Sequence, residues 1–351
     1  MGMTPSHVLR TDGGSTLGFG HINRCLVLAD AIQERGGAPE IVLGTASPDA
    51  HLHIAEAGHV SRQLDPVKTF DPEQTLRTAA FAIFDFSHRE TRSRIEEAKR
   101  LLQASQENGT RTLLIDAKDE DCLSALTAMV ADILVIPYAG ADAEQVIPGA
   151  ITDVRGLEYF VLDRAYLDRP FTDRPVPETV QNVLVTAGGT DTVGLTSFFL
   201  DVLEKITAPL DIHIVIGPGF TSDLTAAIAV RAELMQHKAH LIHAPSNLAD
   251  EVFRADLALS ASGLTKYELA YGGTPSVLVS IDRNHEISNQ PFAALGTGLD
   301  AGKYGATTVD EVAASVKSLL GDAGRRRALA KAGPAAIDGQ GTQRLLDLLN
   351  G

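Results

Sequence analysis

Long hydrophobic runs, cysteine and positive charge are all scarce in this sequence of 351 residues. No apolar run approaches the roughly 20 residues that a helix needs to span a bilayer, so we expect no membrane span. The first ten residues, MGMTPSHVLR, lack the apolar core of a signal peptide. Together these absences predict a cytoplasmic protein.

Cysteine occurs only at Cys25 and Cys122. Cys25 lies on the apolar face of a predicted helix, where a buried free thiol is the commoner arrangement than a disulfide or a metal ligand. His51 and His53 are close in sequence, but we place them in a polar loop with no matching cluster of ligands. We therefore expect neither a metal nor another cofactor.

Positive charge is in deficit, with 30 Lys and Arg residues against 45 Asp and Glu and a net charge of −15. Binding to nucleic acid or to an anionic membrane needs a basic surface, so we expect neither partner. The arginine run 325–327 is interpreted as a solvated helix face. An acidic protein can still bind a small nucleotide, because backbone amides and a helix N-terminus suffice to hold a phosphate. A monomer is possible.

Short apolar runs are regularly spaced along the chain, and helical patterns lie between them. The clearest helix covers residues 21–35 and stops at Gly36-Gly37. The alternation predicts parallel sheets with helices on both faces. The ten expected strands are HVLRT, EIVLG, AAFAIFDF, RTLLIDA, ADILVIP, NVLVTA, IHIVIG, AHLIHA, DLALSAS and PSVLVSI.

Proline and charge are concentrated in LDRPFTDRPVPETVQN, residues 167–182, which predicts a linker. The linker divides the chain into two Rossmann-like doubly wound domains, residues 1–168 and 178–351. We expect a ligand in a cleft between them, at the carboxyl ends of the strands. Residues 309–350 are predicted to be helical.

A glycine-rich turn, LGFGHINR, follows the first predicted strand and contains Gly18 and Gly20. Its spacing does not fit G-x-G-x-x-G, so a dinucleotide site is not indicated. His21 lies where the helix begins, and the positive helix end favours a neutral ring that can accept a proton. A packing role for His21 is the alternative. Asp12 either orients that ring or caps the loop.

Two further turns follow predicted strands in the second half of the chain. A Gly-Gly turn can present amides to phosphate, or can be a simple tight turn. A small-residue loop that opens a helix suits a diphosphate, and a carboxylate one helical turn later suits ribose hydroxyls. The residues concerned are Gly188, Gly189, Thr190 and Asp191 in the first turn, and Ser262, Gly263, Leu264, Thr265 and Glu268 in the second.

The order and spacing of LGFGHINRCLVLADAI, TAGGTD, IGPGF, SASGLTKYELAYGGTP and SNQ resemble the UDP-sugar hydrolases of pseudaminic acid biosynthesis. Those enzymes cleave a UDP-activated diacetamido-trideoxy hexose. They belong to the wider GT-B group, which includes the N-acetylglucosaminyltransferase of peptidoglycan synthesis. The likeness covers nearly the whole chain, and G-x-G-H-x-x-R is its most specific part.

The resemblance implies a GT-B fold and assigns roles to individual residues. His21 is implied to be the base that activates water, and Glu268 to bind the ribose. The uracil is implied to lie near residues 243–251. The remaining implied ligand-binding residues are Asp12, Gly18, Gly20, Arg24, Asp85, Gly188 to Asp191, Ser246, Asn247, Leu248, Ser262 to Thr265, Asn289 and Gln290.

These features predict a hydrolase that cleaves a UDP-sugar with inversion at the anomeric carbon. An inverting glycosyltransferase is the first alternative, with His21 deprotonating an acceptor hydroxyl in place of water. A hydrolysing epimerase is a second. A nucleotide-sugar binding protein without catalysis is the third, and it comes from a different functional class.

Overall fold

The computed structural model describes most of the chain and divides it into two compact units. Unit 1 comprises residues 1–162 and 339–351, and unit 2 comprises residues 163–338. Cys122 and Ser246 lie outside the described residues. Those described are 6–15, 17–64, 76, 79–85, 91–115, 131–141, 150–169, 175–245 and 247–350.

Unit 1 is built on a parallel sheet in the order β3-β2-β1-β4-β5-β6-β7. The order reverses between β1 and β4, where Thr11 pairs with Asp85. Such a reversal is where doubly wound sheets place their ligands. The strands are β1 Ser6–Gly13, β2 Ala38–Ala46, β3 Ser61–Gln63, β4 Ala79–Asp85, β5 Arg111–Ile115, β6 Ala131–Ile136 and β7 Ala150–Arg155.

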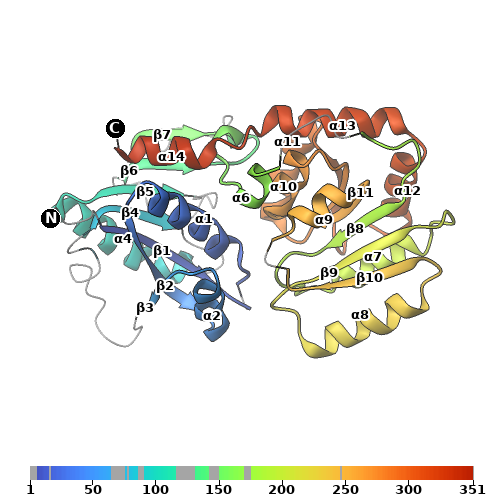
Figure 1. Cartoon of the computed structure of the whole chain (residues 1–351), viewed down its shortest axis with the longest axis horizontal. Helices are drawn as coiled ribbons and strands as arrows, with labels where there is room; N and C mark the ends of the chain where they lie inside the picture. Colours follow the sequence, from blue (N-terminus) through green and yellow to red (C-terminus); the bar gives the residue numbers. More distant parts are fainter. Residues whose placement is uncertain are drawn as a thin grey trace. The chain divides into compact units, whose positions relative to one another are not determined.

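The helices of unit 1 include one from the far end of the chain. In Figure 1, α14 (Gly341–Asn350, red) lies beside the strands of unit 1, and it contacts both α1 and β5. Leu345, Leu346 and Leu349 of α14 are buried in the same apolar cluster as Cys25 and Ile22 of α1. The other described helices are α1 Gly20–Glu34, α2 Pro48–Glu56, α4 Thr91–Asn108 and the 3-10 turn Leu157–Tyr159.

Unit 2 has a six-stranded parallel sheet in the order β10-β9-β8-β11-β12-β13. The order reverses between β8 and β11, which repeats the design of unit 1. β11 and β12 are buried along their whole length, as expected of strands covered on both faces. The strands are β8 Asn182–Thr186, β9 Asp211–Ile216, β10 Lys238–His243, β11 Leu257–Ala261, β12 Ser276–Ser280 and β13 Leu299–Lys303.

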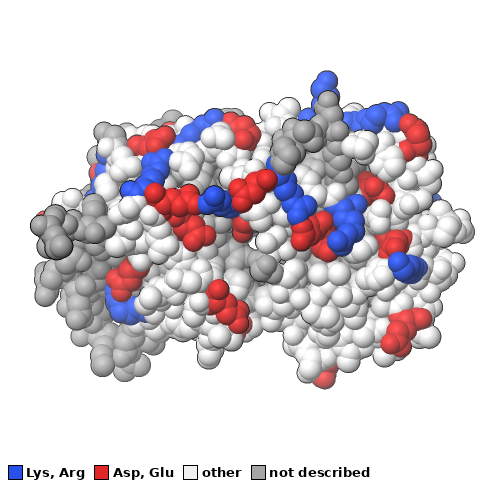
Figure 2. Space-filling model, viewed as in Figure 1, with Lys and Arg blue, Asp and Glu red and all other residues white. Residues whose placement is uncertain are grey.

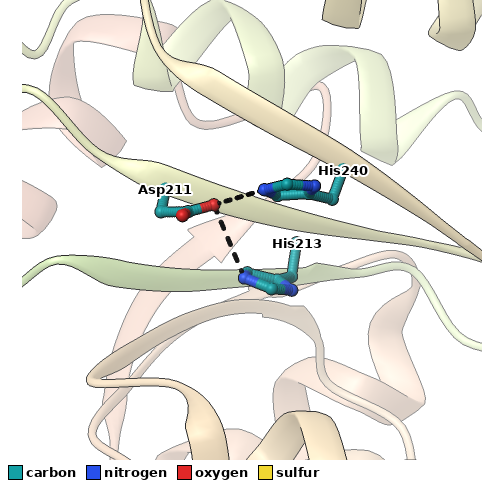
Figure 3. Close-up of side chains that lie close together, drawn as sticks. All are labelled: Asp211, His213 and His240. Atoms are coloured by element: carbon teal, nitrogen blue, oxygen red, sulfur yellow. Dashed lines mark ion pairs between the residues drawn. The ribbon is translucent and has the colours of Figure 1, made fainter.

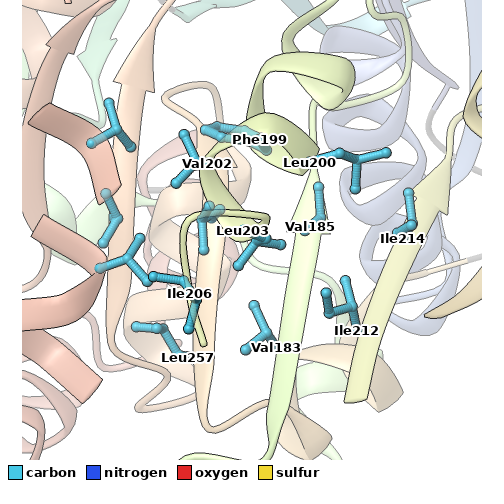
Figure 4. Packing of buried hydrophobic residues seen from close by; sticks show 14 of the residues in the cluster. Val183, Val185, Phe199, Leu200, Val202, Leu203, Ile206, Ile212, Ile214 and Leu257 are labelled. Atoms are coloured by element: carbon cyan, nitrogen blue, oxygen red, sulfur yellow. The ribbon is translucent and has the colours of Figure 1, made fainter. Parts of the chain in front are cut away.

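Apolar side chains from the sheet and from α7 (Leu195–Leu203) form the core of unit 2. Figure 4 shows Phe199, Leu200 and Leu203 of α7 against Val183 and Val185 of β8. The remaining helices of this unit are α6 Arg164–Leu167, α8 Ser222–Leu234, α9 Ala249–Arg254, α10 Thr265–Tyr271, α11 Arg283–Ala294, α12 Val309–Leu320 and α13 Ala323–Ala336.

All ten strands expected from apolar runs are present, and Cys25 is a buried free thiol as predicted. Burial raises the pKa of Cys25 far above its usual value, which leaves the thiol unreactive. The helix expected over residues 21–35 is α1, shifted by one residue. None of the helices in the described part of the chain is both long and apolar enough to span a bilayer.

Three expectations need correction. The structure divides the chain at Leu162 and again at Asp338, whereas a single linker was expected. His51 and His53 lie on helix α2, not in a polar loop. The run 325–327 is only partly solvated, because Arg326 is fully buried and donates hydrogen bonds to backbone carbonyls.

Basic and acidic side chains are interspersed on the surface. On the face drawn in Figure 2, blue and red groups of the described residues lie next to one another. Arg231 and Asp201, for example, form an ion pair with a separation of 2.6 Å. Such partly exposed pairs stabilise the fold by at most about 1 kcal/mol each.

Candidate active site

A histidine, an aspartate and an arginine meet at the strand-order reversal of unit 1. His21 Nδ1 lies 2.7 Å from Asp85 Oδ1. Arg24 donates two hydrogen bonds to the same carboxylate, from Nε to Oδ2 at 2.7 Å and from Nη2 to Oδ1 at 2.6 Å. Arg24 also donates to the Tyr138 hydroxyl at 2.7 Å. The carboxylate is therefore held rigidly, as a bidentate arginine pair requires.

Local backbone geometry explains how His21 reaches this position. β1 ends at Gly13, and Gly14 and Gly18 exchange two backbone hydrogen bonds that close the intervening loop. Gly18 has a φ of +91°, which a residue with a side chain adopts only with strain. Helix α1 begins at Gly20, so His21 projects from the first turn of the helix while Arg24 follows one turn later.

The charges around Asp85 determine its protonation state. Burial of Asp85 would raise its pKa, but the charges of Arg24 and His21 and their hydrogen bonds outweigh burial and lower it to about 2. Asp85 is thus an ionised acceptor at neutral pH. When His21 donates its Nδ1 proton to Asp85, the basic lone pair is on Nε2. A histidine oriented by a buried carboxylate is the arrangement that many general bases use.

The sequence named two of these residues as ligand-binding, and the structure gives them protein partners. Asp85 is fully buried and Arg24 is 4% exposed. Asp12, which was expected to orient His21 or cap the loop, is buried and forms an ion pair with Arg10 at 2.9 Å. His21 is the more accessible member of the group, with 16% of its side chain exposed.

In unit 2, the loops after β8 and β11 adjoin the corresponding strand-order reversal. Gly188 has a φ of +86°. The Gly188-Gly189 turn packs against Gly217, where a Cβ atom would lie 2.6 Å from the Gly188 carbonyl oxygen. Gly219 donates to the Gly189 carbonyl at 2.9 Å. The motifs TAGGTD and IGPGF therefore form one packed glycine-rich unit.

Asp191 caps the helix that follows this turn. Its carboxylate accepts from the Leu195 amide at 2.7 Å and from the Thr196 amide at 2.8 Å. These amides belong to the first turn of α7, and a phosphate would otherwise be able to use them. Thr190 is partly exposed beside it. Asp191 was predicted to contact the ligand, and the structure shows that it also caps helix α7, a role that the sequence did not predict.

The loop Ser262–Thr265 is tied down by a buried chain of polar groups. Ser262 Oγ lies 3.2 Å from Ser280 Oγ, which accepts from Asn289 Nδ2 at 2.9 Å. Lys266 Nζ donates to Asn289 Oδ1 at 3.0 Å and to Ser288 Oγ at 2.7 Å. Both ends of the loop are therefore fixed through Asn289, while Gly263 and Thr265 stay partly exposed.

Lys266 is a residue that the sequence reading missed. It is 1% exposed, and its ammonium lies 5.0 Å from the Tyr267 ring centroid and 5.4 Å from that of Phe292. The signal available in the sequence was its place directly after the loop. Asn289 is fully buried, whereas Gln290 is exposed. The two residues of the Asn-Gln pair thus lie in different environments.

Glu268 lies one helical turn into α10. Burial, reinforced by the charge of Asp163, raises the pKa of Glu268 to about 7. The hydroxyls of Tyr166 and Thr265 act in the opposite direction. Glu268 is therefore poised between its charged and neutral forms near pH 7, which no sequence pattern indicated.

The segment implied to hold the uracil is described except at Ser246. Asn247 Oδ1 accepts from the Ala249 amide at 3.0 Å, and Leu248 precedes α9. Ala244 has a φ of +37°, the single non-glycine residue in the described chain with a positive φ. Left-handed backbone at alanine costs about 1–2 kcal/mol, so this turn is strained.

No protein-family model matches the chain. The spore coat polysaccharide biosynthesis protein SpsG of Bacillus subtilis (strain 168) is 22% identical over 342 residues, which cover 96% of each chain. MurG of Acinetobacter baumannii has a TM-score of 0.66 at 17% identity, over 99% of both chains. The UDP-GlcNAc 2-epimerase of Neisseria meningitidis, solved with UDP-GlcNAc bound, has a TM-score of 0.59 at 12% identity, over 98% of this chain and 99% of that one.

The fold is GT-B. It consists of two Rossmann-like α/β domains with parallel sheets, and the likeness to the solved structures extends over essentially the whole chain. The parallel α/β domains expected from the alternating strands and helices are thus confirmed, as is the GT-B fold that the resemblance implied. At such low identities the likeness carries the fold, and the chemistry has to be argued from the residues themselves.

Proposed function

We propose that the protein hydrolyses a UDP-activated amino sugar, and that its product enters the biosynthesis of a pseudaminic-type sugar acid. The observation that carries the proposal is the contact of His21 with the ionised carboxylate of Asp85. Further support comes from the similarity to a polysaccharide biosynthesis protein and to an epimerase that binds UDP-GlcNAc. In this proposal unit 1 supplies the base and unit 2 binds the nucleotide.

The proposed reaction is a direct displacement. His21 Nε2 removes a proton from water while the water oxygen attacks the anomeric carbon. The bond from that carbon to the diphosphate oxygen breaks, and UDP leaves with the electron pair. Asp85 stabilises the imidazolium that forms, and the two hydrogen bonds from Arg24 hold the Asp85 carboxylate in position. A single displacement inverts the configuration.

The test is a hydrolysis assay on a panel of UDP-activated amino sugars. Release of UDP and of one free sugar with inverted configuration, followed by NMR in the absence of an acceptor, supports the hydrolase. Release that requires an added hydroxyl acceptor supports an inverting glycosyltransferase. Inversion at C2 of the released sugar identifies a hydrolysing epimerase. UDP binding without turnover identifies a binding protein.

The pKa of Glu268 predicts pH-dependent nucleotide binding. The ionised carboxylate can accept strong, charge-assisted hydrogen bonds from both ribose hydroxyls, whereas the protonated form loses the charge and part of its acceptor capacity. Because its pKa is about 7 in the free protein, UDP affinity should rise as pH increases through 7 and fall by up to about tenfold per unit below it. Calorimetric titration with UDP, repeated over about three pH units from about pH 5.5 to about 8.5, measures this change in affinity.

The matched control is Glu268→Gln. It removes the titrating group but not the titration of the nucleotide phosphates. The difference in pH dependence between the two proteins therefore belongs to Glu268. Parallel curves for both proteins would contradict a ribose contact for this carboxylate.

Lys266→Met should weaken UDP binding about tenfold, which is about 1.4 kcal/mol, because Asn289 and Ser288 lose the donor that fixes the loop. The substitution also leaves the buried Ser288 Oγ and Asn289 Oδ1 without this donor, so the melting temperature should fall as well, and UDP affinity is measured well below the transition. The control is Lys303→Met, which removes a partly exposed lysine that pairs with Glu286. Equal UDP affinities in the two variants would show that Lys266 does not position the loop.

A further inference from the structure

Two histidines and an aspartate converge on one face of the β9-β10 ladder. Asp211 and His213 are two residues apart on β9 and therefore share a face. The parallel register pairs His213 with His240 of β10, which brings the second imidazole to the same face. In Figure 3 the two rings lie one above the other, and dashed lines join the Asp211 carboxylate beside them to the Nε2 atom of each ring.

The distances are those of a cluster able to share one ion. Asp211 Oδ1 lies 2.8 Å from His240 Nε2 and 3.6 Å from His213 Nε2. One ligand atom from each residue lies within 4.8 Å of the other two. Ligand atoms in a tetrahedral zinc site are about 3.3 Å apart, given metal–ligand bonds of about 2.0–2.1 Å. His240 and Asp211 are 38% and 30% exposed, which leaves both side chains room for the rotations that this geometry requires.

Asp211 has one oxygen that lacks a proper hydrogen bond. Its Oδ2 accepts from Lys238 Nζ at 2.9 Å. Its Oδ1 is shielded from solvent and, despite the short contact with His240, makes no hydrogen bond of acceptable geometry to any described residue. Buried oxygens of this kind usually have a partner. An ion between Oδ1 and the two imidazoles would provide it.

A carboxylate outside the cluster orients one of the rings. His213 Nδ1 lies 3.1 Å from Glu251 Oε2, and Arg254 Nη1 donates to both oxygens of Glu251 at 2.6 and 2.7 Å. Glu251 Oε2 is thus the acceptor that faces His213 Nδ1, and His213 is expected to donate from Nδ1. Its Nε2 lone pair then points toward Asp211. Metal-bound histidines characteristically donate their other nitrogen to a carboxylate in this way.

We propose that Asp211, His213 and His240 bind a divalent transition-metal ion. Two imidazoles and one carboxylate suit Zn²⁺, Co²⁺ or Ni²⁺ and not Mg²⁺ or Ca²⁺, which prefer oxygen ligands alone. Three protein ligands leave a fourth position for water or a further ligand. Asp211 and Lys238 are the first residues of their strands. The site therefore lies at the amino-terminal ends of the strands, whereas the Gly188 and Ser262 loops follow the carboxyl ends.

The test is a titration of the full, untagged chain with CoCl₂, followed by visible absorption, and with ZnCl₂ by calorimetry. We expect intense d–d bands, a stoichiometry of one, and displacement of Co²⁺ by Zn²⁺. His213→Ala, His240→Ala and Asp211→Asn should each weaken binding at least tenfold, while UDP binding is unchanged. ZnCl₂ should raise the melting temperature of the wild type and not of His240→Ala.

The control is His243→Ala, which removes an exposed histidine from the same strand, outside the cluster. It should leave metal affinity unchanged. An absence of d–d bands, or an equal loss of affinity in His243→Ala and His240→Ala, would overturn the proposal. His240 is the most exposed of the three ligands, so its variant should fold even where His213→Ala does not. Because UDP binding is measured separately, failure here leaves the proposed hydrolysis untouched.

Discussion

His21→Gln should lower kcat for sugar release by about 1000-fold while leaving UDP affinity within twofold of the wild type. Glutamine keeps a hydrogen-bonding group near Asp85 but cannot take a proton from water, and a positioned general base contributes about 10²–10⁴ in rate. Steady-state kinetics on the hydrolysed UDP-sugar, with UDP binding measured in parallel, separates the loss of chemistry from a loss of binding.

His51→Gln is the matched control for that experiment. His51 is a histidine of the same unit, on α2, that bonds to Ser61 Oγ at 2.7 Å. Its replacement should leave kcat within a factor of two. If His21→Gln retained more than a tenth of the wild-type kcat, His21 would not be the base. The packing role that the sequence left open would then be the better interpretation.

Arg326→Met should destabilise unit 2 by about 3–5 kcal/mol. Arg326 is fully buried, and its guanidinium donates hydrogen bonds to backbone carbonyls of two segments that are distant in sequence. It donates to Leu319 and Leu320 at the end of α12, and to Pro177 and Glu178 ahead of β8. Removal leaves four carbonyls short of a donor. The melting transition should fall by about 6–20 °C for a domain of this size.

The adjacent Arg327 provides the comparison. It is about half exposed and pairs with Glu178 at 2.8 Å on the surface. Arg327→Met should shift the melting transition by no more than about 4 °C, because exposed ion pairs are worth at most about 1 kcal/mol. Similar shifts in the two variants would mean that the buried guanidinium does not brace the segment ahead of β8. Differential scanning calorimetry resolves both cases.

The strands that the sequence predicted and those it missed differ in their surroundings. Nine of the ten predicted strands lie inside their sheets and are mostly apolar because helices pack on both faces, whereas the tenth, β10, is an edge strand whose run AHLIHA could still be recognised. The missed strands are β3, β7 and β13, and each is an edge strand of its sheet. β3 has three residues, SRQ, and β13 reads LDAGK. Partial exposure removes the selection for apolar side chains, so no run remains to be recognised.

The candidate site divides in the same way. His21 could be found because a glycine-rich turn and a helix start surround it in sequence. Asp85 was noted as a ligand-binding residue, but its contact with His21 follows from the pairing of β1 with β4, which a single sequence does not reveal. Lys266 and Arg326 each bear a charge that composition alone assigns to solvent. Their burial depends on acceptors that only the folded chain brings together.

The return of α14 to unit 1 makes unit 2 an insertion within unit 1. A Cβ atom on Gly341 would collide with the Phe160 carbonyl, so the two ends of the insertion leave and re-enter unit 1 at nearly the same place. Joining Leu162 to Gly339 by a short linker should therefore give a self-contained unit 1. A stop codon near residue 165 should not, because it would strip away Leu345, Leu346 and Leu349. Two covalent crossings also mean that one proteolytic cut between the units cannot release either of them.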